Sequence, residues 1–159
     1  MRILLQRVSE GRVIIKDQTV AQIKQGITLL LGIHKQDQLQ DADYLIEKCL
    51  NLRIFSDAND KMNLSVIDIK GEVLVVSQFT LYADTRKGRR PGFSESARPE
   101  IAIPLYNYFI EKVRQKMGKV EVGQFGADMK VDLINDGPVT ILIDSEDKYP
   151  KIGISNEGL

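Results

Sequence analysis

The apolar positions of this chain follow two spacings, and the spacing that is typical of strands comes first. Residues 2–15 form an apolar pattern that is interrupted near Gly11, and residues 20–33 contain two more apolar runs with Gly26 as the expected turn between them. Short apolar runs that are separated by glycine favour β-strands. The beginning of the chain is therefore predicted to form short β segments.

Two later segments place apolar residues at steps of three and four positions, which is the spacing of one buried helix face. The first covers residues 37–52, and the second covers residues 99–117, with Pro104 inside it and Gly118 as its expected end. A proline within such a pattern marks a late helix start or a kink. We therefore expect two main helices that pack against a sheet.

The most apolar run is residues 73–76, which follow Gly71. A continuous run of this kind fits a central strand that is covered on both faces, so residues 72–84 are predicted to bring a polar cluster to the end of a buried strand. The candidate catalytic residues in this cluster are Ser77, Gln78, Phe79 and Thr80. Hydroxyl groups, a carboxamide and backbone N–H groups can converge on a developing oxyanion, whereas at an ordinary strand end they are satisfied locally.

Strands are also expected at residues 119–123, 129–134 and 141–143. Residues 135–140 lie between the last two strands and have the composition of a tight turn. Within this turn Gly137 and Pro138 would present two adjacent carbonyl groups rigidly, which is a surface made of backbone alone.

Composition narrows the class of protein. The chain has 159 residues with 22 basic and 22 acidic side chains, so any site for a polyanion must be a local patch. We expect one domain over residues 1–145 and a polar, loosely held tail over residues 146–159. The single cysteine, the absence of a signal-peptide pattern and the absence of a membrane-length apolar run favour a soluble cytoplasmic protein. One histidine and scattered carboxylates predict neither a metal nor another cofactor.

Two loops carry candidate chemistry. His34, the only histidine, would act as a general base only within hydrogen-bond reach of a serine or threonine nucleophile. The loop of residues 84–94 could hold phosphates, with Phe93 stacking on a base or sugar, although a solvated surface loop is the competing interpretation. The cations of this loop are Arg86, Lys87, Arg89 and Arg90.

Two motifs resemble those of one enzyme family. Residues 77–81 match the S-Q-x-x-L motif, and residues 135–140 match the N-x-G-P-V-T motif, of the D-aminoacyl-tRNA deacylases, formerly called D-tyrosyl-tRNA deacylases. Residues 1–8 look like the opening strand of this family, and residues 88–93 look like its basic loop. The resemblance covers residues 1–145.

The resemblance implies a hydrolase of translation quality control that cleaves the ester bond of D-aminoacyl-tRNA, and of glycyl-tRNA mischarged on tRNA(Ala), while rejecting L-aminoacyl-tRNA. It implies an α/β fold of three layers, helix on sheet on sheet, with a barrel-like β core. It also implies a homodimer with active sites at the subunit interface. There the Gly137–Pro138 peptide, in the cis form, would insert beside Ser77 to Thr80 of the other subunit, and Arg7 would hold the inserting loop.

The residues by themselves leave two other functions open. The chain could bind charged tRNA through the basic loop without cleaving it, or it could be a conventional Ser/Thr esterase with His34 as its base. An aminoacyl ester is activated, so its hydrolysis needs orientation, oxyanion stabilisation and a placed water more than a strong nucleophile. Thr80 is the only candidate nucleophile, and the sequence leaves open whether it attacks the ester or positions water.

Overall fold

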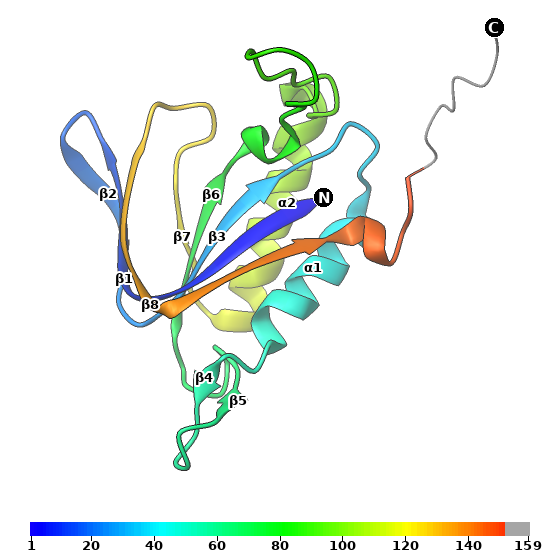
Figure 1. Cartoon of the computed structure of the whole chain (residues 1–159). Coiled ribbons are helices and arrows are strands. Elements are labelled where there is room, and N and C mark those ends of the chain that lie inside the picture. The colour runs from blue at the N-terminus through cyan, green and yellow to red at the C-terminus, as the bar shows by residue number, and fades with distance from the viewer. Residues whose placement is uncertain (152–159) are drawn as a thin grey trace, which may run out of the picture.

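The chain forms one curved β-sheet, a small separate hairpin and two α-helices, and the computed structural model describes residues 1–151 (Figure 1). The helices are α1 (Leu39–Asn51) and α2 (Pro99–Met117), with short 3₁₀ helices η1 (Phe79–Tyr82) and η2 (Ser145–Asp147). The strands are β1 (Arg2–Ile15), β2 (Gln18–Ile23), β3 (Gly26–Gly32), β4 (Phe55–Ser56), β5 (Met62–Leu64), β6 (Glu72–Ser77), β7 (Glu121–Val122) and β8 (Lys130–Asp144).

The sheet is built on β1, which pairs with three other strands. One edge of β1 pairs antiparallel with β8, and the other edge pairs antiparallel with β3 near its beginning and with β2 near its end. β6 then pairs parallel with β3, and β7 pairs parallel with β6. The sheet curls into a nearly closed, barrel-like core (Figure 1).

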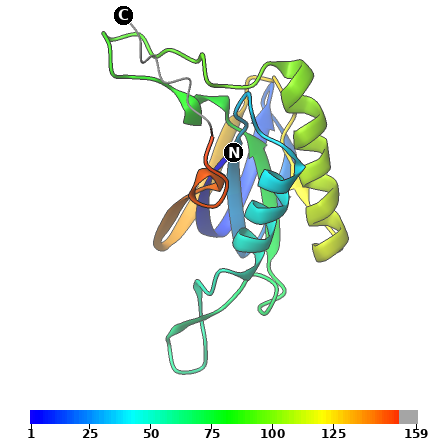
Figure 2. The ribbon, with the colours of Figure 1, turned by 90° about the vertical axis from the view of Figure 1, so that its right-hand side faces the viewer.

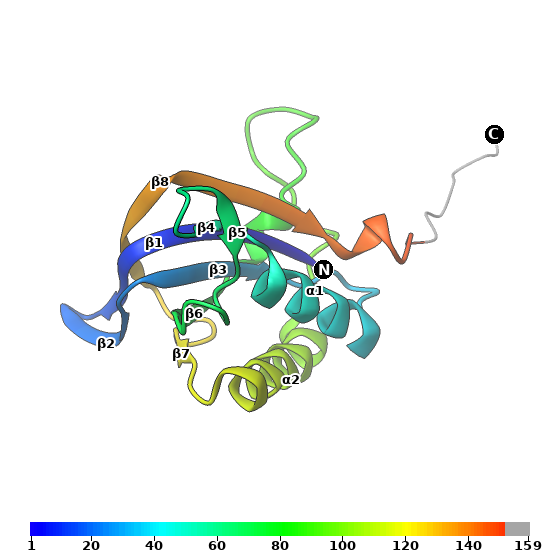
Figure 3. The same cartoon turned by 90° about the horizontal axis from the view of Figure 1, so that it is seen from below.

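Both helices cover the same face of the sheet (Figures 2 and 3). Val73 and Val75 of β6 pack with Phe109 of α2 in the apolar core between the helices and the sheet. Leu74 and Val76, which point the other way, pack inside the curled sheet against residues of β1 and β2. The central strand is therefore covered on both faces, and the predicted three-layer α/β fold is confirmed.

Both predicted helices are present. α1 occupies most of residues 37–52, and α2 begins at Pro99, so Pro104 lies inside the helix and does not mark its start. Gly118 follows α2 with a φ of 78°, a left-handed conformation that glycine adopts without steric penalty. In the described part of the chain, neither helix combines the length and the apolar character that crossing a membrane requires.

The prediction of two strands joined by a tight turn at residues 135–140 is wrong, because β8 continues through these residues. The pairing of β8 with β1 shifts register on both sides of Val8, so β8 bulges there and then resumes its direction. A bulge accommodates extra residues in one strand while the partner strand runs on. Turn-forming residues therefore marked an irregularity within a strand.

Other strand boundaries also differ from the pattern. β1 is not interrupted at Gly11. Gly26 is the first residue of β3 and not a turn residue. Glycine is required there because a Cβ atom would lie 1.9 Å from the carbonyl oxygen of Glu72. The predicted strand over residues 72–84 ends at Ser77 and gives way to η1.

Residues up to Lys151 pack against α1, although the polar composition predicted a loosely held tail. The ammonium group of Lys151 lies 3.0 Å from Asp37 and 2.7 Å from Asp41, and Ser145 donates a hydrogen bond of 2.6 Å to Asp41. Burial alone would raise the pKa of Asp41, but the hydrogen bonds from Lys151 and Ser145 outweigh it and lower this pKa. Residues 152–159 lie outside the described residues.

We expect Lys151→Met to lower the free energy of unfolding by roughly 3 kcal/mol at neutral pH, because it leaves the buried Asp41 without a cation and leaves Asp37 with the Met1 ammonium group alone. The folded-state pKa of Asp41 is depressed, so the stabilisation is present above its unfolded value of about 3.8 and is lost as the pH falls through the folded-state pKa. Urea unfolding at neutral pH and in strong acid measures the effect, which should shrink in acid.

Lys130→Met is the matched control, since this lysine is 77% exposed and its contact with Asp17 is long, at 3.5 Å. It should change stability by less than about 0.5 kcal/mol. A loss for Lys151→Met that is equally large in acid would contradict the assigned role of the ion pair.

Candidate active site

β6 carries the first motif to one end of the sheet, where η1 turns the chain away (Figure 1). The strand ends at Ser77, and the backbone N–H of Gln78 still donates to the carbonyl oxygen of Leu31 at 2.8 Å, so the motif is anchored to β3. The side-chain amide of Gln78 donates to the hydroxyl oxygen of Thr80. The hydroxyl proton of Thr80 is therefore available to a substrate or a water.

Two adjacent backbone donors are open at the start of η1. Phe79 and Thr80 are exposed, and among the described residues their N–H groups donate to no other protein atom. The first N–H groups of a helical turn have no acceptor within the helix. Such a pair of donors can stabilise a negatively charged oxygen.

Residues from outside the motif hold η1 from the other side. The hydroxyl of Ser96 donates a hydrogen bond of 3.0 Å to the carbonyl oxygen of Phe79. The ring of Phe79 meets the ring of Phe93 edge to face, with centroids 5.0 Å apart, although Phe79 remains 54% exposed. The exposed aromatic pair extends the motif toward the basic loop.

The second motif lies in the bulge of β8. The Gly137–Pro138 peptide bond is cis, as the resemblance implied, and both residues are exposed. The side chain of Asn135 ties the bulge together, since its oxygen accepts from the N–H of Val139 at 2.8 Å and its amide donates to the Thr140 hydroxyl at 2.8 Å. The bulge is therefore closed by its own side chains.

Arg7 links this bulge to the segment before β4. Its Nε donates to the carbonyl oxygen of Asp136 at 2.8 Å, and its Nη1 donates to the carbonyl oxygen of Ile54. A Cβ atom at Gly137 would lie 2.8 Å from Nη2 of Arg7. The arginine thus packs directly against the glycine of the motif.

The two motifs do not meet within one chain. Ser77 pairs with Leu31, which pairs with Ile3 of β1, whereas the bulge of β8 lies beside Arg7. The stretch of β1 from Ile3 to Arg7 measures roughly 13 Å at about 3.3 Å per residue. β3 and β1 also separate β6 from β8. Each motif is therefore exposed at its own place on the sheet.

The basic loop follows η1 and carries Arg86, Lys87, Arg89 and Arg90 on the surface. The guanidinium of Arg86 lies 2.8 Å from the carboxylate of Asp84, and its hydrogen bonds hold the pKa of Asp84 well below the usual range. In the part of the chain that the structure describes, no carboxylate pairs with the other three cations. Those three are thus available to an external anion.

His34 is buried and both of its ring nitrogens are engaged. Nδ1 accepts the backbone N–H of Gln36 at 3.1 Å, and Nε2 donates to the carboxylate of Glu95 at 3.0 Å. Among the described residues neither nitrogen contacts Ser77 or Thr80. This geometry gives no support to His34 as a general base.

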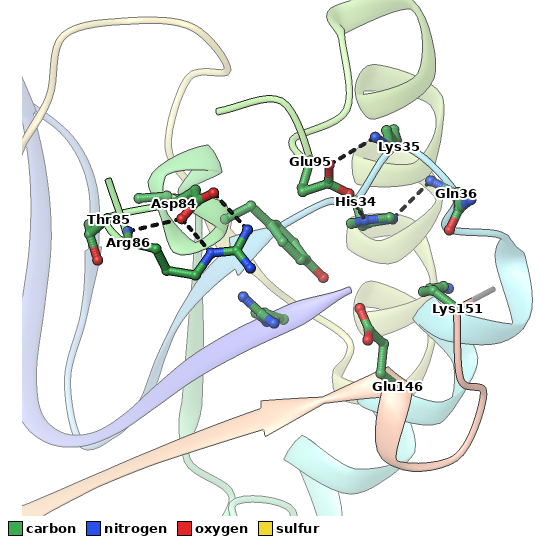
Figure 4. Close-up of a pocket in the computed structure, with 12 residues that line it drawn as sticks. His34, Lys35, Gln36, Asp84, Thr85, Arg86, Glu95, Glu146 and Lys151 are labelled. Carbon is green, nitrogen blue, oxygen red and sulfur yellow. Dashed lines mark hydrogen bonds and ion pairs between the residues drawn. The ribbon is translucent and has the colours of Figure 1, made fainter. Parts of the chain in front are cut away.

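A cavity of about 680 Å³ lies beside the end of η1 (Figure 4). Of the candidate site residues, Arg86 and His34 line it, and the first motif lies outside it. Burial raises the pKa of Tyr82, which also lines this cavity. The other lining residues are Arg2, Lys35, Gln36, Ala83, Asp84, Thr85, Glu95, Glu146 and Lys151.

Sequence reasoning missed two residues that shape the site. Ser96 has no motif around it, and only its contact with Phe79 reveals it. Asp84 is the first residue of the predicted basic loop, and its position two residues before Arg86 is the only sequence signal for their local ion pair. Within residues 1–151, no three His, Cys, Asp or Glu side chains are grouped so that they could hold a metal ion.

We expect Arg7→Lys to lower the free energy of unfolding by about 1 kcal/mol, because an ammonium group cannot reach both carbonyl oxygens that the guanidinium fork spans. Thermal unfolding measures the loss. Arg12→Lys is the control, because Arg12 lies on the same strand but forms an exposed ion pair with Asp132. Equal stability of the two variants would show that the Arg7 contacts do not hold the bulge.

The chain is similar to one family of known proteins over most of its length. The family model described as D-Tyr-tRNA(Tyr) deacylase matches residues 4–144. A protein of Clostridioides difficile named D-aminoacyl-tRNA deacylase is 57% identical over 149 residues, which cover 94% of this chain and 100% of the relative. A protein of Thermosipho melanesiensis with the same name is 56% identical over 147 residues, which cover 92% of this chain and 98% of the relative.

Two solved structures have the same architecture. One described as c-Myc DNA Unwinding Element Binding Protein has a TM-score of 0.86 and 38% identity, with 91% of this chain and 98% of that chain covered. A probable eukaryotic D-amino acid tRNA deacylase has a TM-score of 0.79 at 18% identity, with 90% and 98% covered, which shows a likeness of fold. By its match to the family model and its identity to these relatives, the chain belongs to the D-Tyr-tRNA(Tyr) deacylase family.

Proposed function

We propose that this protein hydrolyses the ester bond between a D-amino acid and the terminal ribose of tRNA, releasing free D-amino acid and tRNA. The observation that carries the proposal is the presence of both motifs in a chain that matches the family over residues 4–144. The curated relatives that share more than half of its aligned residues are named D-aminoacyl-tRNA deacylase. The protein would thus proofread chirality during translation, in the cytoplasm.

The open N–H groups of Phe79 and Thr80 support this chemistry. A water attacks the carbonyl carbon of the ester, the carbonyl oxygen becomes negatively charged, and the ribose oxygen leaves with a proton. The two N–H groups would bind the oxyanion, and loss of one such donor costs about 3 kcal/mol in the transition state. The hydroxyl of Thr80, whose oxygen accepts from Gln78, would hold the attacking water. This role fits the geometry better than nucleophilic attack, since among the described residues no base contacts that hydroxyl.

Selection for the D configuration would come from a main-chain clamp, the cis Gly137–Pro138 peptide. A site that accepts many D-amino acids must read the amino group, the α-carbon and the ester, which all of them share. The carbonyl oxygens of Gly137 and Pro138 would fix the amino group so that an L side chain strikes the pocket wall and a D side chain points to solvent. Glycine has no side chain to strike, so glycyl-tRNA mischarged on tRNA(Ala) would also be cleaved.

The clamp needs a second subunit, because the two motifs lie apart on one chain. The sheet face opposite the helices offers a docking surface: Leu4 and Leu30 lie on it, next to Leu142, which is 61% exposed. Their neighbours Ile3 and Leu31 point to the helix side and are buried. A homodimer formed through this face would cover the apolar patch and bring Gly137 to the partner's first motif.

The acceptor end of tRNA would reach the site past the basic loop. Lys87, Arg89 and Arg90 are exposed and follow η1 directly along the chain. Phosphate binding by such side chains adds affinity without reading sequence. Arg86 would join them only by leaving Asp84.

Release of amino acid from D-tyrosyl-tRNA and from L-tyrosyl-tRNA, without added metal, tests the function. We expect rapid loss of the D ester and no loss of the L ester beyond its spontaneous hydrolysis. Loss of both esters would retain an esterase and reject the chiral clamp. Protection of both esters would instead favour a module that binds charged tRNA without cleaving it.

The same assay distinguishes the proposed deacylase from a conventional Ser/Thr esterase. An enzyme that uses His34 as a base would lose activity in His34→Ala and would cleave small esters without RNA. Both ring nitrogens of His34 are engaged by Glu95 and Gln36, so His34 is not available as a base. We therefore expect the activity of His34→Ala, per molecule of folded protein, to equal that of the wild type.

We expect Gly137→Ala to weaken the discrimination between D and L esters or to lower activity on the D ester by about tenfold or more. Gly137 has a φ of 138°, where a side chain is strained, and an added Cβ would collide with Arg7 and Val139. Initial rates on both tyrosyl esters measure the effect.

Gly126→Ala is the matched control, because Gly126 also has a positive φ, of 76°, but lies before β8 with open space around it. The backbone strain is then present in both variants, and only one of them alters the motif. Full D-selectivity and full activity in Gly137→Ala would reject the clamp.

A further inference from the structure

A hydroxyl group from outside both motifs contacts the proposed oxyanion site. Ser96 lies between the basic loop and α2, and its hydroxyl donates to the carbonyl oxygen of Phe79 at 3.0 Å. This carbonyl belongs to the same planar peptide group as the N–H of Thr80. A hydrogen bond to the oxygen therefore fixes the direction of that N–H.

Ser96 is itself held on both sides. The N–H of Lys35 donates to the carbonyl of Glu95 at 3.1 Å, and the N–H of Ala97 donates to the carbonyl of Ile33 at 2.9 Å. Figure 4 shows the carboxylate of Glu95 between His34 and Lys35, which it contacts at 3.0 and 2.9 Å. The hydroxyl thus projects from a segment that is fastened to the end of β3.

The peptide group that Ser96 contacts lies in the exposed first turn of η1. Within a 3₁₀ turn the Phe79 carbonyl accepts only the N–H of the residue three positions on, so Ser96 supplies a second donor to the same oxygen. Donors that are oriented before the substrate arrives stabilise charge without reorganisation during the reaction. A hydrogen bond accepted by a peptide oxygen also polarises the N–H of the same peptide.

We propose that Ser96 is a positioning residue for the hydrolysis, whose hydroxyl orients the Phe79–Thr80 peptide group so that the N–H of Thr80 faces the developing oxyanion. The proposal rests on the proposed function, because it concerns the same reaction and the same donor. Ser96 touches neither the ester nor the water in this role and acts through the peptide group alone.

The test is the kinetics of Ser96→Ala with D-tyrosyl-tRNA. We expect kcat to fall about tenfold, the effect of one neutral hydrogen bond that matters in the transition state. KM, and the dissociation constant of an amide-linked D-tyrosyl-adenosine that cannot be hydrolysed, should stay within about twofold. Ser96→Thr keeps the hydroxyl and should restore most of kcat, whereas Ser96→Cys, with a weaker donor, should fall between the two.

Ser94→Ala is the matched control, because the hydroxyl of Ser94 contacts the side chain of Glu95 at 3.4 Å and not η1. Its kcat should equal that of the wild type. An unchanged kcat in Ser96→Ala overturns the positioning role, and so does a loss that weakens binding of the amide equally or that Ser96→Thr does not restore. Wild-type protein that leaves the D ester intact would reject the proposed function itself, whereas normal wild-type cleavage with unaffected Ser96 variants rejects only this inference.

Discussion

The pairing of β1 with β3 and β8 is the constraint on which both motifs depend. Through β3, it sets the level at which β6 ends and η1 begins, since Ile3, Leu31 and Ser77 lie in one row. Through β8, it forces the extra residues beside Arg7 to bulge outward. Because one side of each strand is packed in an apolar core, a shift by a single residue would turn every side chain to the wrong face. The spacing of the two motifs is therefore fixed by sheet register.

The candidate site consists largely of backbone groups. The open donors are the N–H groups of Phe79 and Thr80, and the proposed clamp consists of the carbonyl groups of Gly137 and Pro138. The orientation of a backbone group is fixed by other groups. In this site, side chains from elsewhere in the chain donate hydrogen bonds to neighbouring carbonyl oxygens and so fix the peptide planes. Arg7 holds the carbonyl of Asp136, and Ser96 holds the carbonyl of Phe79. Such residues carry no reactive chemistry of their own.

Most charged residues near the candidate site are either paired with each other or exposed on the basic loop. Basic and acidic residues balance at 22 each, and several cations near the site are already paired, such as Arg86 with Asp84. The exposed cations that remain on the basic loop form a local positive patch. A protein of balanced net charge can bind a polyanion only through such a patch. The buried cluster of Lys151, Asp37 and Asp41 serves the fold, because it fastens the chain after η2 to α1.

The sequence by itself determined the two helices, the central strand and the two motifs, because amphipathic periodicity, apolar runs and unusual residue combinations are local properties. It also indicated Arg7 and the cis peptide, although only through resemblance to a family. The continuity of β8 through residues 135–140, the packing of Lys151 and the contact between Ser96 and Phe79 were decided by the tertiary structure. Each of these joins residues that are distant in the chain or depends on the register of a neighbouring strand, and no local pattern records either.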